Sequence, residues 1–147
     1  MIKAVAITDL PAVRDLITTS VMASIPLPDD DQQWLLNGIM ESLDRWQAEP
    51  ETCLHLKYVE GERMLGVLLL KDDWNLVNLF VDPARHGEGI GRALVEAAVQ
   101  HVRTIGNPSI RLNSSDFAVE FYRRLGFVQQ GPGKDRPGGC VPMELTL

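Results

Sequence analysis

Three glycines in the segment from residue 79 to 94 form the part of this sequence best suited to chemistry. An apolar stretch, Leu79–Val81, runs into a turn that contains Gly87, Gly89 and Gly91, and the turn opens directly into a helical pattern. Glycines leave backbone N–H groups bare, so a ligand can approach them closely. The start of a helix adds about half a positive charge at the same place. The segment therefore predicts a phosphate-binding site, unless the glycines serve only as a tight connection between strand and helix.

Two common phosphate-binding motifs do not fit this turn. A Rossmann dinucleotide-binding turn requires glycine where this sequence has Arg92, and an acidic residue where the next strand ends in Asn113. The Gly-Lys-Ser/Thr sequence of a P-loop is also absent. The pattern disfavours both nucleotide-binding folds and favours another phosphate-bearing ligand.

The elements that position this turn can be predicted from the spacing of apolar residues. Alternation and short apolar runs predict strands, whereas recurrence every three to four residues predicts helices. The predicted strands cover 2–7, 52–60, 64–71, 74–81, 109–113, 127–130 and 141–147, and the predicted helices cover 10–23, 31–48, 90–103 and from Ser114 or Ser115 to about 124. Successive hairpins indicate an antiparallel meander, and the strand at 109–113 must return parallel to 74–81. The Gly- and Pro-rich loop 131–139 is expected to be mobile.

Two motifs together resemble those of the GNAT superfamily of N-acetyltransferases. The superfamily turn, Arg or Gln followed by x-x-Gly-x-Gly/Ala, is similar to the run from His86 to Gly91, with His in the first position. The second superfamily block is similar to the run from Asn113 to Phe127, which contains Phe-Tyr and Gly-Phe. The resemblance implies one α/β domain over residues 1–147, in which a mixed, mostly antiparallel sheet has helices on both faces.

The resemblance also implies an acetyl-CoA-dependent N-acetyltransferase that acts on a primary amine. Acetyl-CoA would enter where the strands at 74–81 and 109–113 diverge at a bulge. Backbone groups of Leu79 and Val81 would pair with its pantetheine arm, and the Val81 N–H can serve the thioester carbonyl. Tyr122 matches the general acid that protonates the leaving thiolate, although its place in the motif also suits a core residue. The implied acetyl-CoA contacts are Leu79, Phe80, Val81, His86, Gly87, Glu88, Gly89, Ile90, Gly91, Arg92, Asn113 and Ser115.

Three positions depart from the pattern of the superfamily: His86 replaces Arg or Gln, Ser115 replaces a common Asn, and Asn75 bears on the chemistry. Histone-type members carry a catalytic Glu where this sequence has Asn75, and an amide cannot act as a general base. Either Asp72 or Asp73 acts through a water, or the amine arrives already neutral. The departure also leaves a non-catalytic alternative, a module that binds CoA or acyl-CoA, or regulates a partner, without turnover.

The composition of the chain limits the classes of molecule that it is expected to bind. The chain of 147 residues has a formal net charge of −6, which disfavours nucleic acid, and it lacks an apolar run long enough to cross a membrane. A small cationic amine is therefore the expected acceptor, with Asp29–Asp31 as a helix cap or as the rim of its pocket. Cys53 and Cys140 have no metal or redox spacing, so no metal is expected. Reduced thiols and the lack of a recognisable signal peptide predict a cytoplasmic protein. The resemblance implies that the closing strands can pair into a homodimer.

Four other side chains are expected to be structural. Trp34 and Trp46 recur at helical spacing on the buried face of the helix at 31–48, where they can also wall the acceptor pocket. His101 falls on the apolar face of the helix at 90–103, which predicts a core position. His55 shares one face of a strand with Cys53, and that face is expected to pack rather than to bind zinc.

Overall fold

A seven-stranded sheet in the order β1-β2-β3-β4-β5-β7-β6 organises the chain, and the computed structural model describes all residues, 1–147. All neighbouring strands are antiparallel except β4 and β5, which are parallel. The strands are β1 (Ile2–Ala4), β2 (Cys53–Glu60), β3 (Arg63–Lys71), β4 (Asn75–Val81), β5 (Ser109–Ser114), β6 (Val128–Gln129) and β7 (Val141–Thr146). The predicted mixed, mostly antiparallel sheet is confirmed.

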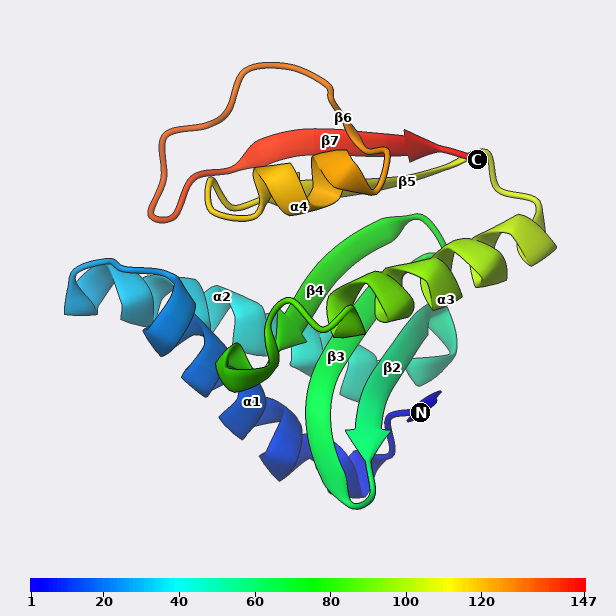
Figure 1. Cartoon of the computed structure of the whole chain (residues 1–147), viewed down its shortest axis with the longest axis horizontal. Coiled ribbons are helices and arrows are strands. Elements are labelled where there is room, and N and C mark those ends of the chain that lie inside the picture. Colours follow the sequence, from blue (N-terminus) through cyan, green and yellow to red (C-terminus); the bar gives the residue numbers. More distant parts are fainter.

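Helices cover both faces of the sheet (Figure 1). The helices are α1 (Leu10–Ser24), α2 (Asp29–Ala48), α3 (Ile90–Ile105) and α4 (Val119–Arg124). On the central strand β3, Val67 and Leu69 pack with α1 and α2, whereas Leu68 and Leu70 pack with α3 and α4. Successive side chains of a strand point to opposite faces, so the apolar run of β3 is buried from both sides.

Several boundaries differ from the prediction. The first strand ends at Ala4, and a 3-10 turn over Ile7–Asp9 leads into α1. Helix α4 begins at Val119 because β5 continues through Ser114, whose hydroxyl donates a hydrogen bond to the Ser115 carbonyl. The prediction that a serine caps this helix is therefore wrong.

Two side chains expected in the core are not there. Trp46 is buried, but Trp34 is 51% exposed. His101 is half-buried, and its Nε2 lies 3.1 Å from an Asp73 carboxylate oxygen. The β3–β4 turn places Asp72 and Asp73 at positive φ and brings Asp73 to α3, a contact that helical spacing alone does not reveal.

The loop 131–139, which the sequence predicts to be mobile, has several anchors in the structure. Lys134 forms a short antiparallel bridge with Cys140, and the Asp116 N–H donates to the Gly138 carbonyl at 2.9 Å. The backbone of Gly138 also lies beside the side chains of Ile25 and Leu27, between α1 and α2, and of Leu35 in α2. The loop therefore joins α4 to the opposite side of the molecule.

Two absences complete the description of the fold. No helix combines the length and the apolarity needed to cross a membrane. No three His, Cys, Asp or Glu side chains lie close enough together to hold a metal ion.

His55 is an unusual core residue. Its side chain is only 5% exposed, its ring packs edge-on against Trp46 with centroids 4.6 Å apart, and its Nδ1 has no hydrogen-bond partner. Burial lowers the pKa of His55 from 6.5 to about 4, although Asp9 acts in the opposite direction. The imidazole is therefore neutral in the folded protein, and its protonation opposes folding.

Replacing His55 by Leu should make the free energy of unfolding less dependent on pH between pH 4 and pH 6.5. An unfolded chain binds a proton at His55 near pH 6.5, whereas the folded chain does so only near pH 4. The stability contributed by the neutral ring is thus complete above pH 6.5 and declines between 6.5 and 4, by up to about 3 kcal/mol. Urea unfolding of both proteins across this range measures the difference. Equal pH slopes for the two proteins would show that His55 is not the sensitive group.

Candidate active site

A β-bulge opens the sheet at the centre of the molecule. Leu69 pairs with Asn78 but Leu70 pairs with Leu76, so Val77 is the extra residue on β4. Beyond this point β4 leaves β5, because the two parallel strands pair only at Asn75 with Arg111 and at Leu76 with Leu112. The predicted divergence of the two strands at a bulge is confirmed.

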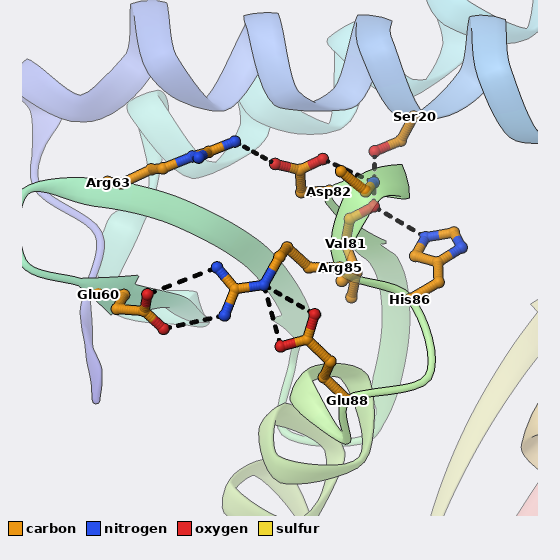
Figure 2. A network of polar contacts seen from close by, with 9 residues as sticks. Ser20, Glu60, Arg63, Val81, Asp82, Arg85, His86 and Glu88 are labelled. Carbon is orange, nitrogen blue, oxygen red and sulfur yellow. Dashed lines mark hydrogen bonds and ion pairs between the residues drawn. The ribbon is translucent and has the colours of Figure 1, made fainter.

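The divergence leaves backbone groups of β4 without a strand partner. The Asp82 N–H donates to the Leu65 carbonyl at 2.8 Å, so Asp82 and Phe80 direct their backbone polar groups toward β3. By the same alternation, Leu79 and Val81 direct theirs into the opening. The Val81 carbonyl already accepts hydrogen bonds from Ser20 Oγ at 3.1 Å and from His86 Nε2 at 3.0 Å (Figure 2). Both groups of Leu79 and the N–H of Val81 therefore remain for a ligand, but the Val81 carbonyl does not.

The glycine-rich turn lies beside this opening. Gly87 and Gly89 have φ values of +82° and +84°, in the left-handed region that favours glycine, and Gly89 is the N-cap of α3. The first backbone hydrogen bond of the helix runs from Ala93 N–H to the Gly89 carbonyl at 3.0 Å. The N–H groups of residues 90–92 therefore lack a helical acceptor and form a cradle for an anion.

Gly91 has a different role from its neighbours in the turn. A Cβ atom at this position would lie 3.1 Å from the Phe121 ring. This glycine therefore allows α3 to approach α4 closely, and it is less suited than Gly89 to a test of ligand binding.

Ion pairs brace the turn against the β2–β3 hairpin (Figure 2). The Arg85 guanidinium binds Glu88 at 2.8 Å and Glu60 at 3.0 Å, and these carboxylates raise the pKa of Arg85 above its usual range. Asp82 accepts a hydrogen bond from Arg63 at 3.0 Å and another from the Ala84 N–H at 2.9 Å. Glu88, an implied acetyl-CoA contact, is thus bound to Arg85 and does not line the cavity described next.

A cavity of about 540 Å³ lies between the turn and α4. Tyr122 lines this cavity, and so does every implied acetyl-CoA contact except Glu88 and Asn113. Three further lining residues that the sequence did not indicate, Ser20, Ser24 and Ile25, reach the cavity from the end of α1. No local signal marks these residues, because they come from an element about 60 positions away in the chain. Phe117, Ala118 and Phe121 also line the cavity, and they belong to the second family motif, which could have indicated them.

A second cavity of about 900 Å³ lies under α2 and the loop 136–140. It contains Asn113, and it contains a buried polar pair that the sequence analysis missed, in which Asn78 Nδ2 donates to Ser42 Oγ at 2.7 Å. Trp34 walls it, as the sequence suggested, but Asp29–Asp31 do not line it. The residues shared by the two cavities are Ile25, Leu79, Phe80, Ser115, Ala118 and Tyr122.

Tyr122 is the only ionisable side chain at the junction of the two cavities. It is 8% exposed, and its ring packs edge-on against Phe121 and Phe127. Burial raises the pKa of Tyr122, so the phenol stays protonated at neutral pH. Its hydroxyl makes no hydrogen bond to the protein, which leaves the O–H group available to a ligand in either cavity.

The structure supplies no carboxylate base at this junction. Asn75 lines neither cavity. Asp72 binds Arg45 at 2.8 Å and Asp73 binds His101, and neither aspartate lines a cavity. The suggestion that Asp72 or Asp73 acts through a water is therefore not supported by their positions.

The fold and the two joined cavities are those of an acetyltransferase domain. Residues 29–147 match the family model of the acetyltransferase (GNAT) domain, and the chain belongs to this family. Peptidyl-lysine N-acetyltransferase YjaB of Salmonella typhimurium is 30% identical over 108 residues, which cover 70% of each chain. Histone acetyltransferase TAP1 of Glycine max is 36% identical over 74 residues, which cover 46% of this chain but only 31% of that protein. This chain thus spans about a third of the length of some curated relatives that it matches.

Solved structures share the whole fold. A GCN5-related N-acetyltransferase from Rhodopseudomonas palustris superimposes with a TM-score of 0.85 at 18% identity, covering 100% of this chain and 95% of that one. The PaiA N-acetyltransferase of Thermoplasma acidophilum, solved in complex with coenzyme A, gives a TM-score of 0.82 at 19% identity, with 100% and 98% covered. At such identities these structures establish the fold.

Proposed function

We propose that this chain transfers the acetyl group of acetyl-CoA to a primary amine of a small molecule. The observation that carries the proposal is the junction of two cavities at Tyr122, one beside an anion cradle and the other open on the α2 side. Two substrates that enter from different sides can meet there, which is the proximity that acyl transfer requires. Acetyl-CoA supplies an activated acetyl group when it is bound.

The first cavity suits CoA in the polar groups that lie along it. The free N–H groups at the start of α3 would hold the pyrophosphate. Leu79 and Val81 offer backbone groups for the amides of the pantetheine arm, and the Val81 N–H can stabilise negative charge on the thioester oxygen. The phosphate therefore needs no direct contact with Arg85, whose charge is already compensated by Glu60 and Glu88.

The chain's contribution to the chemical step centres on Tyr122. As the new C–N bond forms and the C–S bond breaks, the Tyr122 hydroxyl donates its proton to the leaving sulfur. The attacking nitrogen releases one N–H proton to solvent water as it becomes an amide nitrogen, and Tyr122 regains a proton from solvent. The amine must lose its own proton first, and no carboxylate is among the residues shared by the cavities. The amine is therefore expected to react in its neutral form.

The acceptor cannot be taken from the relatives. Their names specify acceptors as different as peptidyl lysine and glucosamine 6-phosphate. The expectation of a cationic small molecule came from the net charge of −6, with Asp29–Asp31 as a helix cap or as the rim of its pocket, and these three residues do not line the second cavity.

Release of free CoA from acetyl-CoA with a panel of primary amines tests the proposal. We expect turnover with at least one amine, and a kcat/KM that rises with pH up to the pKa of that amine. CoA should raise the melting temperature, and NAD or ATP at equal concentration should raise it much less. A CoA-dependent shift without turnover of any amine would favour the non-catalytic alternative, and a larger shift with NAD would contradict the assignment of the first cavity.

A further inference from the structure

The second cavity differs in charge from the chain as a whole. The chain has a formal net charge of −6, yet the cavity is lined by two cations, Lys71 and Arg136, and by one carboxylate, Glu41. None of these three side chains forms an ion pair with another residue. Every other lining side chain is neutral or weakly polar. The cavity therefore offers more positive than negative charge to whatever enters it.

The other acidic residues near this side of the molecule lie outside the cavity lining, including Asp116, whose carboxylate lies beside the backbone of Gly139. Asp72 is bound to Arg45 and Asp73 to His101. Asp29–Asp31 occupy the first turn of α2, where they favour the positive end of the helix, and they lie outside the cavity.

Backbone contacts anchor the loop that carries Arg136, whose exposed side chain lines the second cavity. The Gly139 N–H donates to the Arg136 carbonyl at 2.8 Å, and the carbonyl of Gly138 accepts from Asp116. Gly138 packs on Ile25, which belongs to both cavities. Lys71 lies at another part of the cavity wall, at the end of β3 opposite Asn75, where β4 and β5 are still paired.

We propose that the acetyl acceptor carries an acidic group, a carboxylate or a phosphate, in addition to its amine, and that Arg136 and Lys71 select for it. This inference rests on the proposed function. Arg136 can bind either acid through two parallel N–H donors, whereas Lys71 acts as a point charge. The single carboxylate, Glu41, can bind the amine as an ammonium group when the acceptor enters, and the amine then loses its proton before it reacts.

Matched acceptors with and without the acid test this inference. One pair is 4-aminobutyrate and 4-aminobutanamide, and the other is glucosamine 6-phosphate and glucosamine. For at least one pair we expect a kcat/KM about 10–100-fold higher for the acidic member, the scale of one hydrogen bond to a charged group. The pair that shows the preference distinguishes a carboxylate from a phosphate.

Variants of the two cations connect the preference to the cavity. Arg136→Gln and Lys71→Gln should reduce the preference, and the double variant should abolish it. Arg103→Gln is the matched control, because Arg103 lies exposed on α3, outside both cavities, and forms no ion pair. Calorimetric titration of the same acceptors into the CoA-bound protein reports their binding independently of turnover.

The outcomes separate the two proposals. Equal or better turnover and binding of the neutral members would overturn the inference and leave acetyl transfer intact. A preference for the acidic members that survives the double variant would also overturn it. Binding of acidic amines without turnover would support the charge selection while contradicting the proposed activity.

Discussion

Replacing Tyr122 by Phe should lower kcat by about 10²–10⁴-fold, which is the usual contribution of one general acid. Tyr122 lines both cavities at their junction, and the proposed function assigns its hydroxyl the protonation of the leaving thiolate. Affinity for acetyl-CoA should hardly change, because the ring and its contacts with Phe121 and Phe127 remain. Steady-state kinetics with any accepted amine, together with CoA titration, measure both quantities.

The stability of the variant should stay close to that of the wild type. The Tyr122 hydroxyl makes no hydrogen bond to the protein, so its removal breaks none. Tyr58→Phe is the matched control, because Tyr58 is the only other tyrosine and it lies on β2, outside both cavities. The loss should also be smaller for an acetyl thioester of a more acidic thiol, which needs no proton to depart. If the Tyr122 variant turned over at the wild-type rate, Tyr122 would be a structural residue of the core with no catalytic role.

Gly89→Asp should weaken CoA binding by about 10–100-fold or more, since lost hydrogen bonds to a charged group cost about 1.5–3 kcal/mol each. The new carboxylate would enter the anion cradle and repel the phosphate. Nothing lies within 4 Å of a Cβ atom built at Gly89, so the substitution creates no clash. Calorimetric titration with CoA measures the change.

Gly89→Asn is the matched control, because it separates the effect of the negative charge of the new side chain from the effect of its size. Asn and Asp have nearly the same size, both tolerate positive φ better than most residues, and both are favoured at a helix N-cap. The Asn variant should bind CoA more tightly than the Asp variant, and both should melt cooperatively. Equal affinity of the wild type and the folded Asp variant would place the phosphate elsewhere.

Local patterns predicted most of the sheet because the central strands are short apolar runs bounded by clear turns. The run that became β3 and the strand-to-helix turn at Gly87 and Gly89 are examples, since both depend on neighbours in the chain. The parallel return of β5 followed from the helix that connects it to β4. The main error in a helix boundary, at α4, arose because a serine can end a strand as readily as it can cap a helix.

The parts of the site that were missed come from distant segments. Ser20 binds the Val81 carbonyl across 61 positions, and Glu60 binds Arg85 across 25. Such contacts depend on how the elements pack, and no spacing within one element reveals them. Glu88 lies within the glycine motif, but its carboxylate is bound to Arg85 and it does not line the cavity. A position in the motif therefore does not by itself show that a residue contacts the ligand.

The two cavities offer a ligand polar groups of different kinds, and this has a consequence for redesign. In the first cavity, the proposed donor side, the free polar groups described above belong to the backbone of β4 and of the α3 start, and ion pairs brace the glycine-rich turn against the β2–β3 hairpin. In the second cavity, the proposed acceptor side, the charged groups are side chains, among them Glu41 of α2 and Arg136 of the loop 136–140. Side chains can be exchanged without moving the backbone of another element. Selection of variants at α2 and this loop should therefore yield enzymes with altered acceptors that keep the same acyl donor.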